Sequence, residues 1–125
     1  MQKLGNYYNS ELNQFIGENL PKIMTSIDLD LFQVKTARKI IRFAEYKHDK
    51  ESLKNQQEKA LKQLAIIAKV INSNSEMFDG WTIQVVLIRG NKPFSKIMVH
   101  DFLTSKDFIF DNEKDINTFL TLEKF

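Results

Sequence analysis

The chain has 125 residues, of which 42% are hydrophobic and 27% are charged, and its formal net charge is +2. A chain of this length and composition is expected to form a single globular domain, residues 1–125, with one core. The absence of cysteine excludes a disulfide framework, a thiolate metal site and a cysteine nucleophile, and it is compatible with a cytoplasmic, intracellular location. The longest apolar run in a helical pattern, LAIIAKVI, is too short to span a bilayer, so no membrane partner is expected.

The first predicted elements are a helix and a β-hairpin. Apolar residues recur at three- and four-residue spacing over residues 7–20, and Pro21 ends this helical pattern. From Thr25 the apolar period changes to two, and the later run IIRFAEYKH alternates in the same way. Two such strands joined by a short polar segment predict a hairpin.

Acidic residues occur in both strands of this hairpin. If Asp30 lies opposite Glu45, the centre of the hairpin falls between residues 37 and 38; if Asp28 lies there instead, the centre moves by one residue. The sequence leaves this register open. Lys47 follows Glu45 by two residues, so both side chains are predicted to share one face of the strand.

The rest of the chain predicts two more strands and two more helices. Residues 50–73 have the strongest helical pattern, with an apolar stripe. The segments 81–90 and 94–102 have the composition of strands, and a short helix capped by Asp111 or Asn112 closes the chain. The order α, β, β, α, β, β, α predicts an α/β (α+β) domain with a mixed central sheet flanked by helices.

The acidic pair and the lysine suggest a chemistry. Two carboxylates about 4 Å apart repel by roughly 4 kcal/mol at an effective dielectric constant near 20, unless a cation binds there or one group takes up a proton. Mg²⁺ or Mn²⁺ suits two carboxylates, a backbone carbonyl and waters. Lys47 beside them is placed to position a metal-bound water or to stabilise an oxyanion. Metal, activated water and lysine together suit phosphodiester hydrolysis.

Asp30 in DLDLF and Glu45-Tyr46-Lys47 in FAEYKH resemble the PD-(D/E)XK nuclease superfamily. In that superfamily an Asp on one strand is followed by (Asp/Glu)-X-Lys on the next, within a restriction-endonuclease-like αβββαβ core. The resemblance covers roughly residues 7–90. It implies a Mg²⁺- or Mn²⁺-dependent DNA endonuclease in which Asp30, Glu45 and the Tyr46 carbonyl bind the metal and Lys47 acts on the water.

The sequence departs from the pattern of this superfamily in two places. Leu29 stands where the family usually has Pro, and this leaves Asp28 as a competing metal ligand. Only two clear strands precede the long helix, where the family has three. The first strand of the core is therefore expected to be very short, near KIMT at residues 22–25, or absent.

Two further residues fit the resemblance. Many members carry a Gln on the helix after the motif, and Gln57 lies four residues after Leu53 and four before Leu61, on the stripe that faces the sheet. Some members carry a Glu on the first helix, where this chain has Glu11. The plainer alternatives are that Gln57 turns to solvent and that Glu11 is an acid favoured by the helix dipole.

The small size of the chain leaves little room for a separate recognition domain. It favours a homodimer that acts on DNA structure, as in small archaeal Holliday junction resolvases, which are similar in size and layout. The alternative is a catalytically silent module of the same fold that binds nucleic acid or protein through the Lys-rich helix. A third interpretation is a structural interaction domain in which the hairpin acids are merely solvated.

Overall fold

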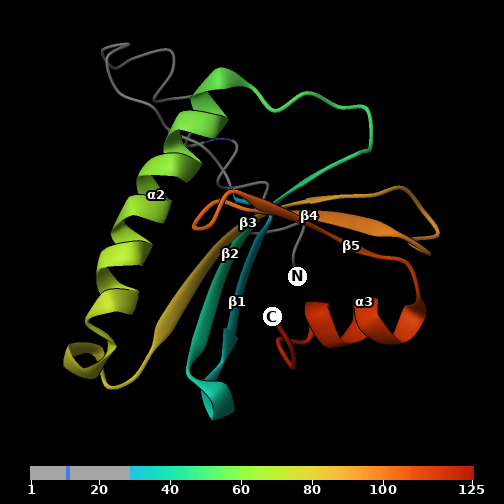
Figure 1. The fold of residues 1–125 in the computed structure, drawn as a ribbon. Helices are drawn as coiled ribbons and strands as arrows, with labels where there is room; N and C mark the ends of the chain where they lie inside the picture. The colour runs from blue at the N-terminus through green and yellow to red at the C-terminus, as the bar shows by residue number, and fades with distance from the viewer. Residues whose placement is uncertain (1–10, 12–28) are drawn as a thin grey trace.

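The computed structural model describes residue 11 and residues 29–125. The described part is a mixed α+β fold with a five-stranded sheet and two helices, as the predicted class requires (Figure 1). The elements are β1 (Leu31–Lys35), β2 (Ile40–Lys47), α2 (Asn55–Ser73), β3 (Thr82–Arg89), β4 (Ile97–Asp101), β5 (Lys106–Phe110) and α3 (Glu113–Leu120), with short 3-10 turns at Thr36–Arg38 and Ser75–Phe78.

The five strands lie side by side in their order along the chain. Strands β2 and β3 are parallel and are connected through α2, because a parallel pair needs a long crossover. The other neighbouring strands are antiparallel and are joined by short connections. The carboxyl ends of β2 and β3 therefore meet at the same edge of the sheet, near the point where α2 begins.

The register of the β1–β2 hairpin settles a question that the sequence left open. Leu31 pairs with Ala44, and one further step along this register sets Asp30 opposite Glu45. The centre of the hairpin falls between residues 37 and 38, inside the 3-10 turn. The alternative register, shifted by one residue about its centre, is not adopted.

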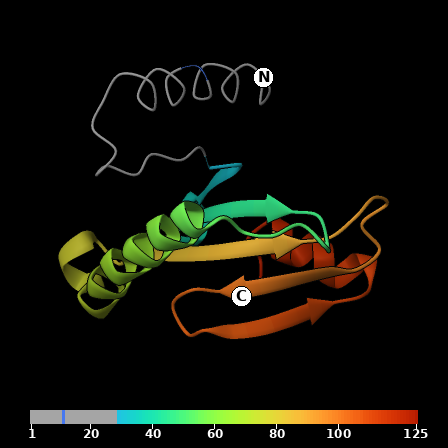
Figure 2. The same ribbon diagram turned by 90° about the horizontal axis from the view of Figure 1, so that it is seen from above.

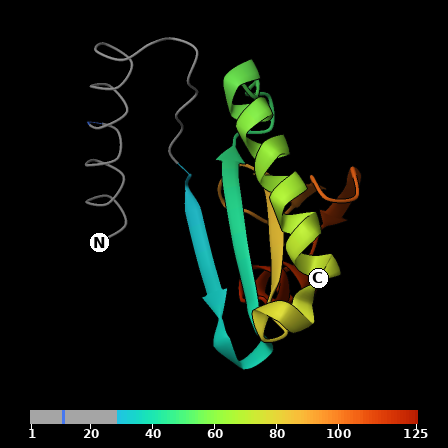
Figure 3. The same cartoon turned by 90° about the vertical axis from the view of Figure 1, so that its left-hand side faces the viewer.

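The two helices cover opposite faces of the sheet (Figures 2 and 3). Strand alternation divides the apolar residues between two clusters, each packed against one helix. The α2 cluster contains Leu61, Ala65, Ala68, Val85, Leu87 and Phe102. The α3 cluster contains Ala44, Val86, Ile88, Ile97, Val99, Ile116 and Phe119. Burial of each large apolar side chain stabilises the fold by about 1.5–3 kcal/mol.

The end of α3 is held by polar side chains of the sheet. Arg42 is fully buried, and its Nη1 donates to the Phe119 carbonyl at 2.6 Å while its Nε donates to Gln84 at 2.9 Å. The Gln33 amide donates to the Leu120 carbonyl at 2.7 Å. The Gln33 amide gives the Leu120 carbonyl a partner at the end of the helix, where backbone carbonyls lack one. Arg42 adds a second donor to the Phe119 carbonyl, which also accepts from the Leu122 N–H at 3.2 Å. Burial lowers the pKa of Arg42 to about 10.

Two predicted boundaries were wrong. Helix α2 begins at Asn55, five residues after the predicted start at Lys50. Lys54 has extended backbone angles (φ −69°, ψ 149°), and its N–H donates to the Gln57 side chain at 3.2 Å, which caps the helix there. The strand predicted over residues 94–102 is confined to residues 97–101.

The sequence analysis did not predict strand β5. It did predict the short closing helix, which is α3. The chain reverses after β4 through Ser105, which has a φ of 60°, and returns as Lys106–Phe110. Asn112 caps α3 by accepting from the Asp115 N–H at 2.9 Å, which decides between the two predicted caps. The predicted first helix lies outside the described residues except for Glu11, which is helical. Within the described residues, no helix has the length and apolar character to cross a membrane.

Candidate active site

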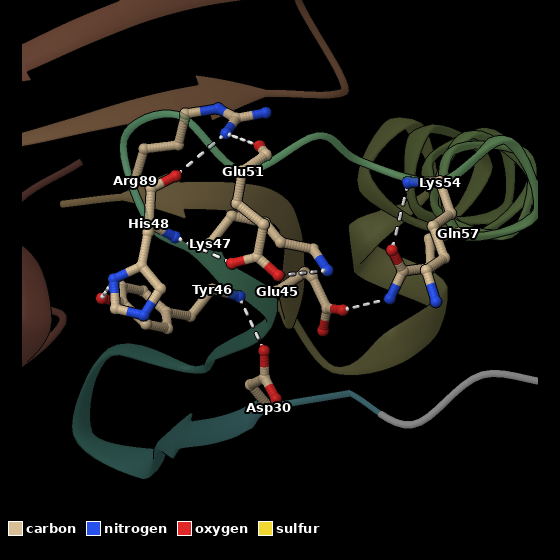
Figure 4. Close-up of polar contacts among 9 residues, drawn as sticks. All are labelled: Asp30, Glu45, Tyr46, Lys47, His48, Glu51, Lys54, Gln57 and Arg89. Carbon is tan, nitrogen blue, oxygen red and sulfur yellow. Dashed lines mark hydrogen bonds and ion pairs between the residues drawn. The ribbon is translucent and has the colours of Figure 1, made fainter. Parts of the chain in front are cut away.

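Glu45 and Lys47 lie near the carboxyl end of β2, on the face of the sheet that α2 covers (Figure 4). Strand alternation places them on the same side as Phe43, which packs against the α2 cluster. Both residues are buried, with 3% and 8% of their surface exposed. In open α/β sheets ligands bind beyond the carboxyl ends of parallel strands, which is where these two charged groups lie.

Asp30 reaches this pair from the start of the neighbouring strand. It is exposed and precedes β1 directly, and its Oδ2 accepts from the Tyr46 N–H at 2.9 Å. The Tyr46 side chain lies on the opposite face and donates its hydroxyl to the Gly90 carbonyl at 2.6 Å. The Tyr46 side chain is therefore directed away from the site, and only the Tyr46 backbone carbonyl remains a candidate metal ligand. Asp28, the competing ligand, lies outside the described residues.

The two carboxylate oxygens of Glu45 differ in their hydrogen bonds. Its Oε2 accepts from the Gln57 amide at 2.9 Å, whereas its Oε1 is buried and has no hydrogen-bond partner within the described part of the chain. Burial, then the nearby negative charge of Asp30 and a side-chain hydrogen bond that the neutral carboxyl group shares with Asp30, raise the pKa of Glu45 to about 7, although Lys47 acts in the opposite direction. The unpartnered Oε1 is therefore a property of the charged form. Near neutral pH this group is therefore divided between its charged and neutral forms.

Gln57 connects the carboxylate to the start of α2. Its Oε1 accepts from the Lys54 N–H at 3.2 Å, and its Nε2 donates to Glu45. One amide therefore caps the helix and orients a carboxylate, as the view in Figure 4 shows. The partial positive charge of a helix N-terminus also favours an anion there. Gln57 faces the sheet, as its place on the apolar stripe predicts.

Lys47 is held within a network that the sequence analysis did not identify. Its Nζ lies 3.5 Å from the Glu51 carboxylate, which also accepts from the His48 N–H at 3.2 Å. Arg89 donates through Nη1 to the backbone carbonyls of His48, at 3.2 Å, and of Glu51. The His48 amide, and to a lesser extent Lys47, hold the pKa of Glu51 below its ordinary value. An arginine at the end of an otherwise apolar strand was the available signal for Arg89.

Two of the predicted site residues, Asp28 and Glu11, are not placed relative to the site by the described residues. Glu11 is an exposed helical residue, and the segment that connects it to β1 lies outside the described residues, so its predicted role in the site stays a prediction. Within residues 29–125 no group of three or more histidine and carboxylate side chains is placed to hold a metal ion. The described site therefore offers the carboxylates of Asp30 and Glu45, the Gln57 amide, and Lys47 paired with the Glu51 carboxylate.

Comparison with models of known protein families, with curated proteins and with solved structures finds no match to this chain. The resemblance to the PD-(D/E)XK superfamily therefore depends on the residues and their arrangement alone.

Proposed function

We propose that the protein is a metal-dependent DNA endonuclease of the PD-(D/E)XK type. One observation carries this proposal. Glu45 is buried with an unpartnered oxygen, beside a second carboxylate at Asp30, and Lys47 shares its face at the end of the same strand. A purely structural strand face would not be expected to bury a carboxylate beside a second carboxylate, because the two negative charges repel each other.

A hard divalent cation fits this arrangement. Such ions prefer carboxylate, carbonyl and water oxygens, and a cation near the unpartnered Oε1 of Glu45 would offset the repulsion from Asp30. Asp30, Glu45 and the Tyr46 carbonyl are the groups that would hold Mg²⁺ or Mn²⁺. When bound, the ion supplies Lewis acidity and lowers the pKa of a water molecule.

The residues of the chain supply position and charge for phosphodiester hydrolysis. In this reaction water adds to phosphorus, the bond from phosphorus to the leaving oxygen breaks, and that oxygen takes up a proton. Lys47 orients the attacking water or stabilises the negative charge that develops on the phosphate. Gln57 fixes the orientation of Glu45, and Arg89 with Glu51 fixes the segment that follows Lys47.

The described topology is compatible with a restriction-endonuclease-like core. The run β1, β2, α2, β3, with β2 parallel to β3, has the order of the last four elements of αβββαβ. The first helix and a first strand near residues 22–25 fall outside the described residues. We further propose a homodimer that acts on DNA structure, since no described element forms a separate recognition domain.

The second candidate is a catalytically silent module of the same fold that binds nucleic acid or protein. The exposed lysines of α2 favour this candidate, because they present positive charge without a role in the site. They are Lys59, Lys62 and Lys69. Metal dependence distinguishes the two candidates, since the silent module has no need of Mg²⁺ or Mn²⁺.

The test is cleavage of a panel of supercoiled plasmid, single strands, flaps and a four-way junction. Each substrate is incubated with Mg²⁺, with Mn²⁺ and with chelator, beside the Lys47→Ala variant and a Lys106→Ala control on the opposite face. We expect cutting that requires metal, that Lys47→Ala abolishes and that Lys106→Ala retains. DNA retarded on a gel without cutting would favour the silent module, and cutting by Lys47→Ala at the normal rate would contradict the assigned role.

A further inference from the structure

A hollow lies on the same face of the sheet as Glu45 and Lys47. Its volume is about 260 Å³, and it is lined by Leu87, Arg89, Met98, His100 and Asp107. None of these residues belongs to α2, so the hollow lies over β3, β4 and β5.

The register of the sheet sets this hollow beside the candidate active site. Glu45 pairs with Leu87, Leu87 pairs with His100, and His100 pairs with Asp107. Because neighbouring strands lie about 4.8 Å apart, the backbones of Glu45 and His100 are separated by about 10 Å. Arg89 contributes to both the hollow and the candidate active site, since it lines the hollow and holds the backbone of the segment after Lys47.

The hollow has an apolar floor and a polar rim. Leu87 is buried beneath it, and Met98 is 41% exposed beside it. His100 Nδ1 lies 2.8 Å from Asp107 Oδ1, and the rings of His100 and Phe102 are nearly perpendicular with their centroids 4.8 Å apart. The His100 ring is therefore fixed in orientation while a third of its side-chain surface remains exposed.

An apolar floor with a polar, aromatic rim is suited to binding one flat, partly polar ring. Nucleobases stack on histidine rings and on arginine guanidinium planes, and they bury their faces against apolar side chains. Clefts that take whole drug-sized ligands measure roughly 300–1,000 Å³, so this hollow has room for one ring system. A base within a duplex is stacked and paired and cannot enter it without being extruded.

We propose that the hollow binds an unpaired nucleobase next to the phosphodiester bond that is cut, with His100 as the principal contact and Asp107 as its positioning residue. This inference rests on the proposed function and narrows its substrate class to nucleic acid that is single-stranded at the cut. A flap, a single strand or the unpaired centre of a branched molecule has such a base, and a blunt duplex does not.

The experiment measures the affinity of the full-length protein for a labelled single strand and for the blunt duplex of the same sequence. Ca²⁺ replaces Mg²⁺ so that binding is measured without turnover. We expect the wild-type protein to prefer the single strand, and His100→Ala to weaken single-strand binding about tenfold while duplex binding stays within about twofold. His100→Phe keeps a ring for stacking and is expected to retain most of the affinity.

Lys106→Ala is the matched control, because it removes a positive charge from β5 on the opposite face of the sheet. Equal affinity of the wild-type protein for single strand and duplex would overturn the inference. So would single-strand binding that His100→Ala leaves unchanged, and in that case metal-dependent cutting that Lys47→Ala abolishes would still uphold the proposed function. No binding and no cutting of any substrate would overturn both.

Discussion

Glu45 is the residue whose electrostatics most constrain the site. Its pKa of about 7 in the folded protein lies above the ordinary value of 4.5, so folding favours its neutral form. The associated stability is fully present below pH 4.5 and is lost as the pH rises through 7. A difference of this size corresponds to about 3 kcal/mol of unfolding free energy, at 1.36 kcal/mol for each pKa unit.

We therefore predict that, in chelator, the free energy of unfolding falls between pH 5 and pH 8, and that Glu45→Gln removes most of this fall. The glutamine keeps an oxygen for the Gln57 amide and carries no charge. Urea unfolding of both proteins at the two pH values measures the effect. An equal fall in the wild-type protein and in Glu45→Gln would show that another group causes it.

At Asp30 we predict that an amide is tolerated. In chelator at pH 8, Asp30→Asn should melt at the same temperature as the wild-type protein or at a higher one. The asparagine oxygen still accepts from the Tyr46 N–H, and a negative charge is removed from beside Glu45. Asp111→Asn, an exposed change before α3, serves as control. A clear loss of stability specific to Asp30→Asn would identify Asp30 as a structural partner instead.

At the scale of elements, Gln57 joins the start of α2 to β2, and two substitutions separate its two contacts. Gln57→Ala loses both the cap and the donor to Glu45, and we expect it to cost about 1–3 kcal/mol of unfolding free energy. Gln57→Glu keeps an acceptor for the cap but places a further carboxylate beside Glu45, in addition to Asp30. Its loss of stability should therefore be larger at pH 8 than at pH 5, and Mg²⁺ should restore part of it. Thermal melts at both pH values, with and without Mg²⁺, measure this, and equal losses at the two pH values would contradict it.

Much of the hairpin was predictable because its chemistry is local. Period-two alternation fixes which side chains share a face, and the polar segment limits the centre of the turn, so Asp30 opposite Glu45 was one of only two registers considered. The position of Gln57 followed from the apolar stripe of the helix. These predictions depend on spacing within a single element or between neighbouring elements.

The features that escaped prediction depend on contacts between distant segments. The start of α2 is delayed because Arg89 holds the backbone of Glu51 and because Gln57 caps the helix at Lys54. Strand β5 is short and begins with the charged residues Lys106 and Asp107, after a turn without glycine, so its sequence has no clear strand pattern. Such features depend on partners 30 or more residues away or on weak local signals.

At the scale of the whole molecule, the two faces of the sheet differ in the residues that they carry. The α3 face gathers an apolar core around Arg42, and the α2 face carries the carboxylates, the lysine and the hollow of His100. We predict that Arg42→Ala lowers the unfolding free energy by roughly 3 kcal/mol, because it leaves the Gln84 side-chain oxygen without its donor in a buried place, removes one of the two donors to the Phe119 carbonyl and empties the space over the Phe119 ring. Urea unfolding at pH 7 measures this change.

Arg38→Ala is the matched control for that prediction. Arg38 is exposed and donates to the Leu122 carbonyl at 2.7 Å, at the margin of the same helix end. Its removal should cost about 1 kcal/mol or less. Equal losses for the two variants would show that burial of Arg42 contributes nothing beyond one hydrogen bond.

The binding of Mn²⁺ to the full-length protein at pH 8, measured by titration calorimetry, tests the central claim most directly. We predict binding that is stoichiometric with the chain, that Glu45→Gln abolishes and that the control Asp111→Asn leaves intact. No binding to the wild-type protein, or binding that Glu45→Gln leaves undiminished, would contradict a metal site at the end of β2.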